Sequence, residues 1–177
     1  ANAAACADSL PALVCLDAVA HAETAAGELE PGAVIDIPFE GENLPPTLYK
    51  MFTAGEEPAG LRVRLPDDYS TDRSFPVLVY VPGYHGGPKG NIDNAVTIAG
   101  ARGWIAASLP LFKKALDRDE PAGGVIVSFE DYAVLSKAYR ILLGRLFEMI
   151  PNTDRDASAM VGFSNGALTI AVLVSCH

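Results

Sequence analysis

Apolar and polar residues alternate in two short segments in the first half of the chain. Residues 34–37 read Val-Ile-Asp-Ile between turn-forming residues, which predicts a short strand. In residues 61–65, three aliphatic residues alternate with two arginines, and this period of two is typical of a strand with one exposed face. We expect this second strand to lie at an edge of its sheet.

Three further segments are mostly apolar. Residues 77–81 form a β-branched and aromatic run, as expected for a strand that is covered on both faces in a parallel sheet. Residues 104–111 give a second apolar strand, which ends at Pro110. Residues 156–164 give a third. We expect the first of these runs to be a central strand.

Helical patterns lie between the apolar runs. Residues 91–101 can form a helix with either Asn91 or Asn94 as its N-cap. Ser128 and Asp131 have the spacing of a capping box, and they open the clearest helix of the chain. Its apolar residues recur at helical spacing: Leu135, Ala138, Leu142, Leu146 and Met149.

A final helix is predicted to begin at Asn165 and to run through the apolar sequence GALTIAVLVS. Strands therefore alternate with helices along the chain, which favours right-handed crossovers between parallel strands. The predicted fold class is α/β, with a predominantly parallel sheet and helices on both faces.

Composition narrows the range of partners. The 177 residues suit one domain, and half of them are apolar. A net charge of −9 leaves no basic stripe for nucleic acid or an anionic membrane surface, and no apolar run reaches the roughly 18 residues of a membrane span. Cys6, Cys15 and Cys176 show neither zinc-site spacing nor a disulfide framework, so we expect no metal and no cofactor, while the redox compartment stays open.

The first thirty residues differ from the rest, and we assign residues 1–30 to a leader and residues 31–177 to one domain. An apolar stretch at residues 10–20 precedes Ala-His-Ala, a pattern that often precedes signal-peptidase cleavage. Asp17 interrupts the stretch, and no basic segment precedes it. The leader is either a clipped secretion signal, which implies an extracellular or periplasmic protein, or a flexible Ala-rich segment, which leaves the cytoplasm open.

A serine lies between two glycines where the third apolar run meets the last helix. Gly162-Phe163-Ser164-Asn165-Gly166 fits the G-x-S-x-G pattern of a nucleophile elbow, a tight turn from strand to helix. Small neighbours give room to a strained serine, and the start of the helix offers N–H groups where an oxyanion would form. The alternative is a strand–helix junction that uses serine and glycine by chance.

The loop after the central strand can supply the second part of such a site. It reads VPGYHGG at residues 81–87, and its glycines allow the backbone to bend toward a carbonyl group. We predict an oxyanion hole formed by the backbone N–H groups of Tyr84 and Asn165, with His85 and Gly86 at the rim. The alternative is a flexible connection with an exposed histidine. Nucleotide binding is disfavoured because neither G-x-G-x-x-G nor G-K-[ST] is present.

Taken together, the segments LRVRLPDDY, FPVLVYVPG, WIAASLPL and VGFSNGA resemble the α/β-hydrolase superfamily over residues 61–177. The pattern is most similar to single-domain secreted esterases, including feruloyl and acetylxylan esterases, polyhydroxyalkanoate depolymerases and prolyl-oligopeptidase-like hydrolases. The resemblance implies that Ser164 is the acylated nucleophile and that the N–H of Asn165 follows it. Pro82 stands where many relatives carry a non-catalytic histidine.

The resemblance also implies a catalytic acid and a histidine that follow the serine along the chain. The last residue, His177, would lie about 18 Å along the predicted helix from Asn165, so it is not expected to be the base. His85 lies in the predicted oxyanion loop and His21 in the leader. We therefore interpret the chain as the N-terminal portion of a longer hydrolase domain, without the triad acid and base, and expect it to be nearly inert alone.

Two functions are consistent with these sequence features. The first is a serine hydrolase that acts on small-molecule or polymer-linked carboxylic esters through an acyl-enzyme. The second is a non-catalytic binding module with the same fold. The oligomeric state and the acyl and alcohol specificity stay open at this point.

Overall fold

The computed structural model describes residues 29–39, 59–83, 89–110 and 129–175, with only the backbone at 129–134. These residues form five strands and three helices. In chain order they are β1 (Val34–Pro38), β2 (Gly60–Arg64), β3 (Phe75–Val81), α2 (Ile92–Ala99), β4 (Ile105–Ser108), α3 (Phe129–Met149), β5 (Thr153–Gly162) and α4 (Asn165–Ser175).

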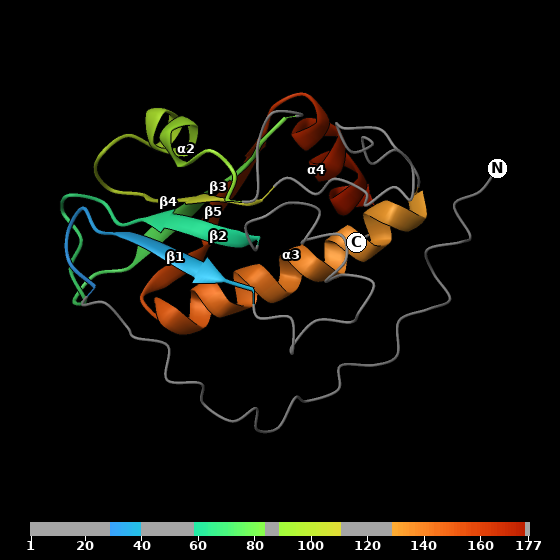
Figure 1. The fold of residues 1–177 in the computed structure, drawn as a ribbon. Helices are drawn as coiled ribbons and strands as arrows, with labels where there is room; N and C mark the ends of the chain where they lie inside the picture. The colour runs from blue at the N-terminus through green and yellow to red at the C-terminus, as the bar shows by residue number, and fades with distance from the viewer. Residues whose placement is uncertain (1–28, 40–58, 84–88, 111–128, 176–177) are drawn as a thin grey trace, which may run out of the picture.

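The five strands form one sheet in the order β1-β2-β4-β3-β5. Strand β3 pairs in parallel with both β4 and β5, whereas β2 is antiparallel to both of its neighbours. Four strands therefore run in one direction and β2 runs against them. Helix α2 covers one face of the sheet, and α3 lies on the other (Figure 1). The predicted fold class, a mostly parallel sheet with helices on both faces, is confirmed.

The prediction that residues 61–65 form an edge strand is wrong. Strand β2 has β1 on one side and β4 on the other, so β1 is the outer strand. Leu61 and Val63 are fully buried, while Arg62 is partly exposed and binds Asp36 of β1. The alternating pattern correctly reports one open face of the strand. It carries no information about whether the lateral hydrogen-bonding edges have partners.

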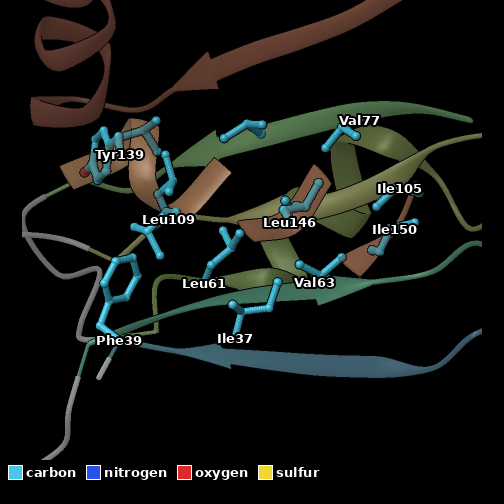
Figure 2. Close-up of a cluster of buried hydrophobic side chains, with 14 of the residues drawn as sticks. Ile37, Phe39, Leu61, Val63, Val77, Ile105, Leu109, Tyr139, Leu146 and Ile150 are labelled. Atoms are coloured by element: carbon cyan, nitrogen blue, oxygen red, sulfur yellow. The ribbon is translucent and has the colours of Figure 1, made fainter. Parts of the chain in front are cut away.

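The main core lies between the sheet and α3 (Figure 2). The apolar residues that recur at helical spacing along α3 are buried in this core, except for Met149, which is only partly buried. They pack against side chains from the inner strands: Leu61, Val63, Val77 and Ile105. The apolar side of α3 thus covers the same face of the sheet to which β2 directs its aliphatic residues.

A second, smaller cluster lies under α2 on the other face of the sheet. Ala95 of this helix packs with residues of β3 and β4, namely Leu78, Tyr80 and Ala106. The helix begins after Asn91, whose side-chain oxygen accepts a hydrogen bond from the backbone N–H of Asn94 at 3.1 Å. Of the two N-cap candidates, Asn91 is therefore the cap.

Strand β5 contains the third predicted strand, and it is much less buried than β3. It begins at Thr153, before the predicted start, and within the described part of the chain it pairs with β3 alone. Several of its side chains are exposed, including Met160. An apolar run predicts a strand well, but its burial depends on neighbours on both sides.

The predicted leader lies almost entirely outside the described residues, as do Cys6, Cys15 and Cys176. Near its end, Leu29 packs against the main core, and the carbonyl oxygen of Glu30 accepts a hydrogen bond from the N–H of Ala33 at 3.1 Å. Among the helices that the structure describes, none combines the length and apolar character needed to cross a bilayer.

Candidate active site

The turn between β5 and α4 carries Ser164. Strand β5 ends at Gly162 and α4 begins at Asn165, so the predicted strand–turn–helix geometry is confirmed. Ser164 is exposed and has a φ of 53°, the one positive φ of a non-glycine residue in the described ranges. This left-handed conformation costs a side-chain-bearing residue about 1–3 kcal/mol, and the surrounding structure must impose it.

Backbone hydrogen bonds fix the turn on both sides of the serine. The N–H of Phe163 donates to the carbonyl of Val81 in β3 at 3.2 Å. On the helical side, the N–H of Ala167 donates to the carbonyl of Ser164 at 3.0 Å, and that of Gly166 to the carbonyl of Phe163 at 2.9 Å. Ser164 is therefore held between the adjacent strand and the first turn of α4.

The two glycines of the motif are required by close backbone approach. A Cβ atom on Gly166 would overlap the backbone oxygen of Val81, because the start of α4 is pressed against the end of β3. A Cβ atom on Gly162 would lie 2.5 Å from the carbonyl carbon of Gly166, closer than real contacts allow. The glycines thus permit the helix to begin directly against the strands that position the serine.

The end of the β3 segment lies beside the serine as well. A Cβ atom on Gly83 would be 3.0 Å from Cδ1 of Phe163 and 3.2 Å from Cβ of Ser164. The chain therefore leaves β3 in direct contact with the turn. This is expected for neighbouring parallel strands, whose carboxyl ends meet at one edge of a sheet.

After residues 84–88, the described chain resumes at a well-anchored position. Lys89 lies 3.5 Å from a carboxylate oxygen of Asp36, and the N–H of Asn91 donates to the fully buried hydroxyl of Ser108 at 2.7 Å. The predicted oxyanion donor and rim residues precede these anchors and lie outside the described residues: Tyr84, His85 and Gly86. Their roles stay predictions.

Asn165 occupies the first helical position after the serine. It is 7% exposed, and its carbonyl oxygen accepts a hydrogen bond from the buried hydroxyl of Thr169 at 2.9 Å. Backbone N–H groups at a helix start carry partial positive charge, so this end of α4 favours negative charge near Ser164. The assignment of the Asn165 N–H as an oxyanion donor stays a prediction.

Asp68 and Tyr69 have shifted pKa values, and both lie at the end of the sheet opposite to Ser164. A hydrogen bond from the N–H of Gly103, just before β4, lowers the pKa of Asp68. Burial raises the pKa of Tyr69, whose hydroxyl bonds Asn152 just before β5. Ser164 instead follows β5, so these groups are not part of its site.

The described residues include Ser164 but no histidine. All three histidines lie outside the described ranges, so no histidine is placed relative to Ser164. Within those ranges, no group of three or more His, Cys, Asp or Glu residues could hold a metal ion. The described part of the site is therefore an exposed serine directly before the start of α4.

Phe163 enters the sequence motif only as its variable position. In the structure its side chain is 68% exposed, directly before the serine, and Leu168 on the first turns of α4 is 62% exposed. The sequence shows that the variable position of G-x-S-x-G is a phenylalanine, but the pattern does not predict whether its side chain is exposed.

No protein-family model and no curated protein sequence matches the chain. Solved structures with a similar fold include a protein assigned as a dipeptidyl aminopeptidase IV from Bacteroides ovatus, at 15% identity and a TM-score of 0.49, over 81% of this chain and 19% of that chain. A CE1 ferulic acid esterase from Anaeromyces mucronatus gives 18% identity and a TM-score of 0.46, over 82% and 55% of the two chains.

A thermostable esterase is also similar, at 20% identity and a TM-score of 0.36, over 80% of this chain and 37% of that chain. All three proteins are α/β-hydrolases, the superfamily that the sequence resembles. The likeness is one of fold at low identity. The chain spans 55% or less of the length of each of these proteins.

Proposed function

We propose that Ser164 is the nucleophile of a serine hydrolase that acts on carboxylic esters through an acyl-enzyme. One observation carries the proposal: the exposed serine has a left-handed backbone conformation between β5 and α4. Two glycines that tolerate no side chain flank it. A strained serine at a strand-to-helix turn is the defining geometry of a nucleophile elbow.

In the proposed reaction, the Oγ of Ser164 attacks the acyl carbonyl carbon while a histidine takes its proton. The backbone N–H groups of Asn165 and Tyr84 stabilise the resulting oxyanion. The bond to the alkoxy group then breaks, and the alcohol leaves with the proton from the histidine. Water activated by the same histidine releases the acid and restores the serine. We assign this histidine, and the carboxylate that orients it, to parts of the protein outside the described residues.

The activity is proposed for the full product of the gene that encodes this chain, since the chain spans about half or less of the similar solved structures. The proposed substrates are small-molecule or polymer-linked esters. The Ala-His-Ala sequence near the start supports an extracellular or periplasmic location.

Hydrolysis of p-nitrophenyl acetate and butyrate by the full gene product tests the proposal. Ser164→Ala should lower kcat by at least about 10³-fold, because loss of a triad member removes the covalent route. Ser175→Ala is the matched control, since Ser175 is exposed at the other end of the same helix and its hydroxyl bonds only the helix backbone at Val172 among the described atoms. It should keep full activity.

Equal activity of the wild-type protein and Ser164→Ala would contradict the assignment of the nucleophile. A folded wild-type protein that hydrolyses no ester would favour the alternative function, a non-catalytic binding module with this fold.

A further inference from the structure

Phe163 has an unusual position for a large aromatic side chain. It is 68% exposed and belongs to neither of the two apolar clusters in the described part of the chain. Burial of a phenylalanine side chain is worth about 1.5–3 kcal/mol, and most of this gain is not realised here. Packing within the described core therefore does not explain this residue.

The backbone of Phe163 is nevertheless held in place, and one edge of its ring lies against Gly83. The N–H of Phe163 is bonded to the carbonyl of Val81, which ties its backbone to β3. Its Cδ1 atom lies 3.0 Å from the place that a Cβ atom on Gly83 would occupy. The ring thus lies close against the bare backbone of Gly83, and a side chain at this glycine would push against it.

The ring and the serine side chain share one surface. Both Cδ1 of Phe163 and Cβ of Ser164 lie within 3.2 Å of the same point above Gly83. A group bonded to the Oγ of Ser164 therefore begins close to the edge of the aromatic ring. An apolar substituent next to the reacting carbonyl carbon can then contact this ring.

A second exposed apolar side chain lies one turn further along. The N–H of Leu168 donates to the carbonyl of Ser164 at 3.3 Å, which places Leu168 in the first turns of α4. Its side chain is 62% exposed. The serine is thus followed, as well as preceded, by an apolar side chain that the described core does not cover.

We propose that Phe163 determines specificity by contacting the apolar part of the ester, with Leu168 extending the contact for longer chains. This inference rests on the proposed function of Ser164. It assigns the substrate class as esters with an aliphatic acyl or alkoxy group of several carbons. Each methylene buried against these side chains should raise kcat/KM by up to about fourfold, the equivalent of about 0.8 kcal/mol per CH₂.

Two ester series measured with the full gene product test this inference: p-nitrophenyl esters from acetate to octanoate, and acetates of alcohols from ethanol to hexanol. For the wild-type protein, kcat/KM should rise with chain length in at least one series. Phe163→Ala should lower kcat/KM for the longest member at least about tenfold, while the shortest member changes less than about threefold. Val174→Ala is the matched control, because Val174 is 71% exposed near the far end of the same helix. It should leave both series unchanged.

An equal loss for short and long esters in Phe163→Ala would overturn the inference, as would a wild-type rate that does not rise with chain length in either series. If the alanine variant does not fold, Phe163→Gln replaces it, because glutamine has a side chain of similar length without its apolar character. The loss of kcat/KM is again compared between the longest and the shortest ester. Failure of the proposed function is distinguishable, because Ser164→Ala would then hydrolyse the shortest esters as fast as the wild-type protein does.

Discussion

At the scale of single residues, the turn that carries Ser164 depends on positions that have no room for a side chain. Ser164 is held with a φ of 53° because the backbone on both sides is pressed against β3 and the start of α4. Gly162 and Gly166 make this approach possible. The sequence predicted this feature well, since a glycine–serine–glycine spacing reports local backbone geometry. The exposure of Phe163 was not predicted, because it depends on neighbours from other segments.

A pair of glycine substitutions tests this steric explanation. Gly166→Ala should destabilise the protein by about 1–3 kcal/mol or more, because its methyl group overlaps the backbone oxygen of Val81. Gly144→Ala is the matched control in the middle of α3, where a Cβ atom meets nothing within 4 Å. It should instead stabilise the protein by about 0.5–1 kcal/mol, the usual gain from glycine to alanine in a helix.

Urea unfolding followed by circular dichroism measures both changes in the free energy of unfolding. Similar small effects at the two positions would show that α4 is not packed as closely against β3 as described.

At the scale of elements, the outer strand β1 is joined to β2 by a side-chain pair across the sheet. Asp36 and Arg62 are directly opposite in the antiparallel register. The guanidinium donates to both carboxylate oxygens, at 2.6 and 2.8 Å. These hydrogen bonds from Arg62 hold the pKa of Asp36 below its ordinary value of 3.8, with a smaller contribution from Lys89. The strands themselves were predictable from periodicity, but this pairing was not, because residues 39–59 separate β1 from β2 and the pattern within each strand does not report its partner.

The pH dependence of stability tests the contribution of this pair. At neutral pH, Asp36→Asn should lower the free energy of unfolding by at most about 1 kcal/mol, since the pair is partly exposed to solvent. Because the folded-state pKa of Asp36 is depressed, its contribution is complete above the unfolded value of 3.8. It is lost as the pH falls through the folded-state pKa.

The difference between the wild-type protein and Asp36→Asn should therefore shrink on acidification below 3.8. A difference that stays constant or grows at acidic pH would rule out a stabilising role for the ionised carboxylate. Arg62→Gln should remove the effect of Asp36→Asn, since the two substitutions break the same interaction.

At the scale of the whole molecule, the candidate site joins segments that are far apart in the sequence. Gly83 at the end of the β3 segment and Ser164 after β5 lie in contact because both strands are parallel and end at the same edge of the sheet. Alternation of strands and helices predicted a parallel sheet whose strands end at a common edge, but not that β3 and β5 are neighbours in it. The strand order, with β2 antiparallel between β1 and β4, was beyond the sequence patterns, because those patterns report faces and not lateral neighbours. Tyr84 lies outside the described residues, and its role, like the triad base and acid, stays a prediction.

Covalent labelling by a fluorophosphonate is the most direct measurement of the central claim, that Ser164 is an activated nucleophile. The full gene product should react with the probe at one serine. Cleavage after Arg155 gives a peptide that contains Ser158, Ser164 and Ser175, and fragment ions can distinguish an adduct on each of these serines. We predict an adduct on Ser164 that is absent from Ser164→Ala. A folded protein that stays unlabelled, or an adduct on Ser158 or Ser175 instead, would contradict the claim.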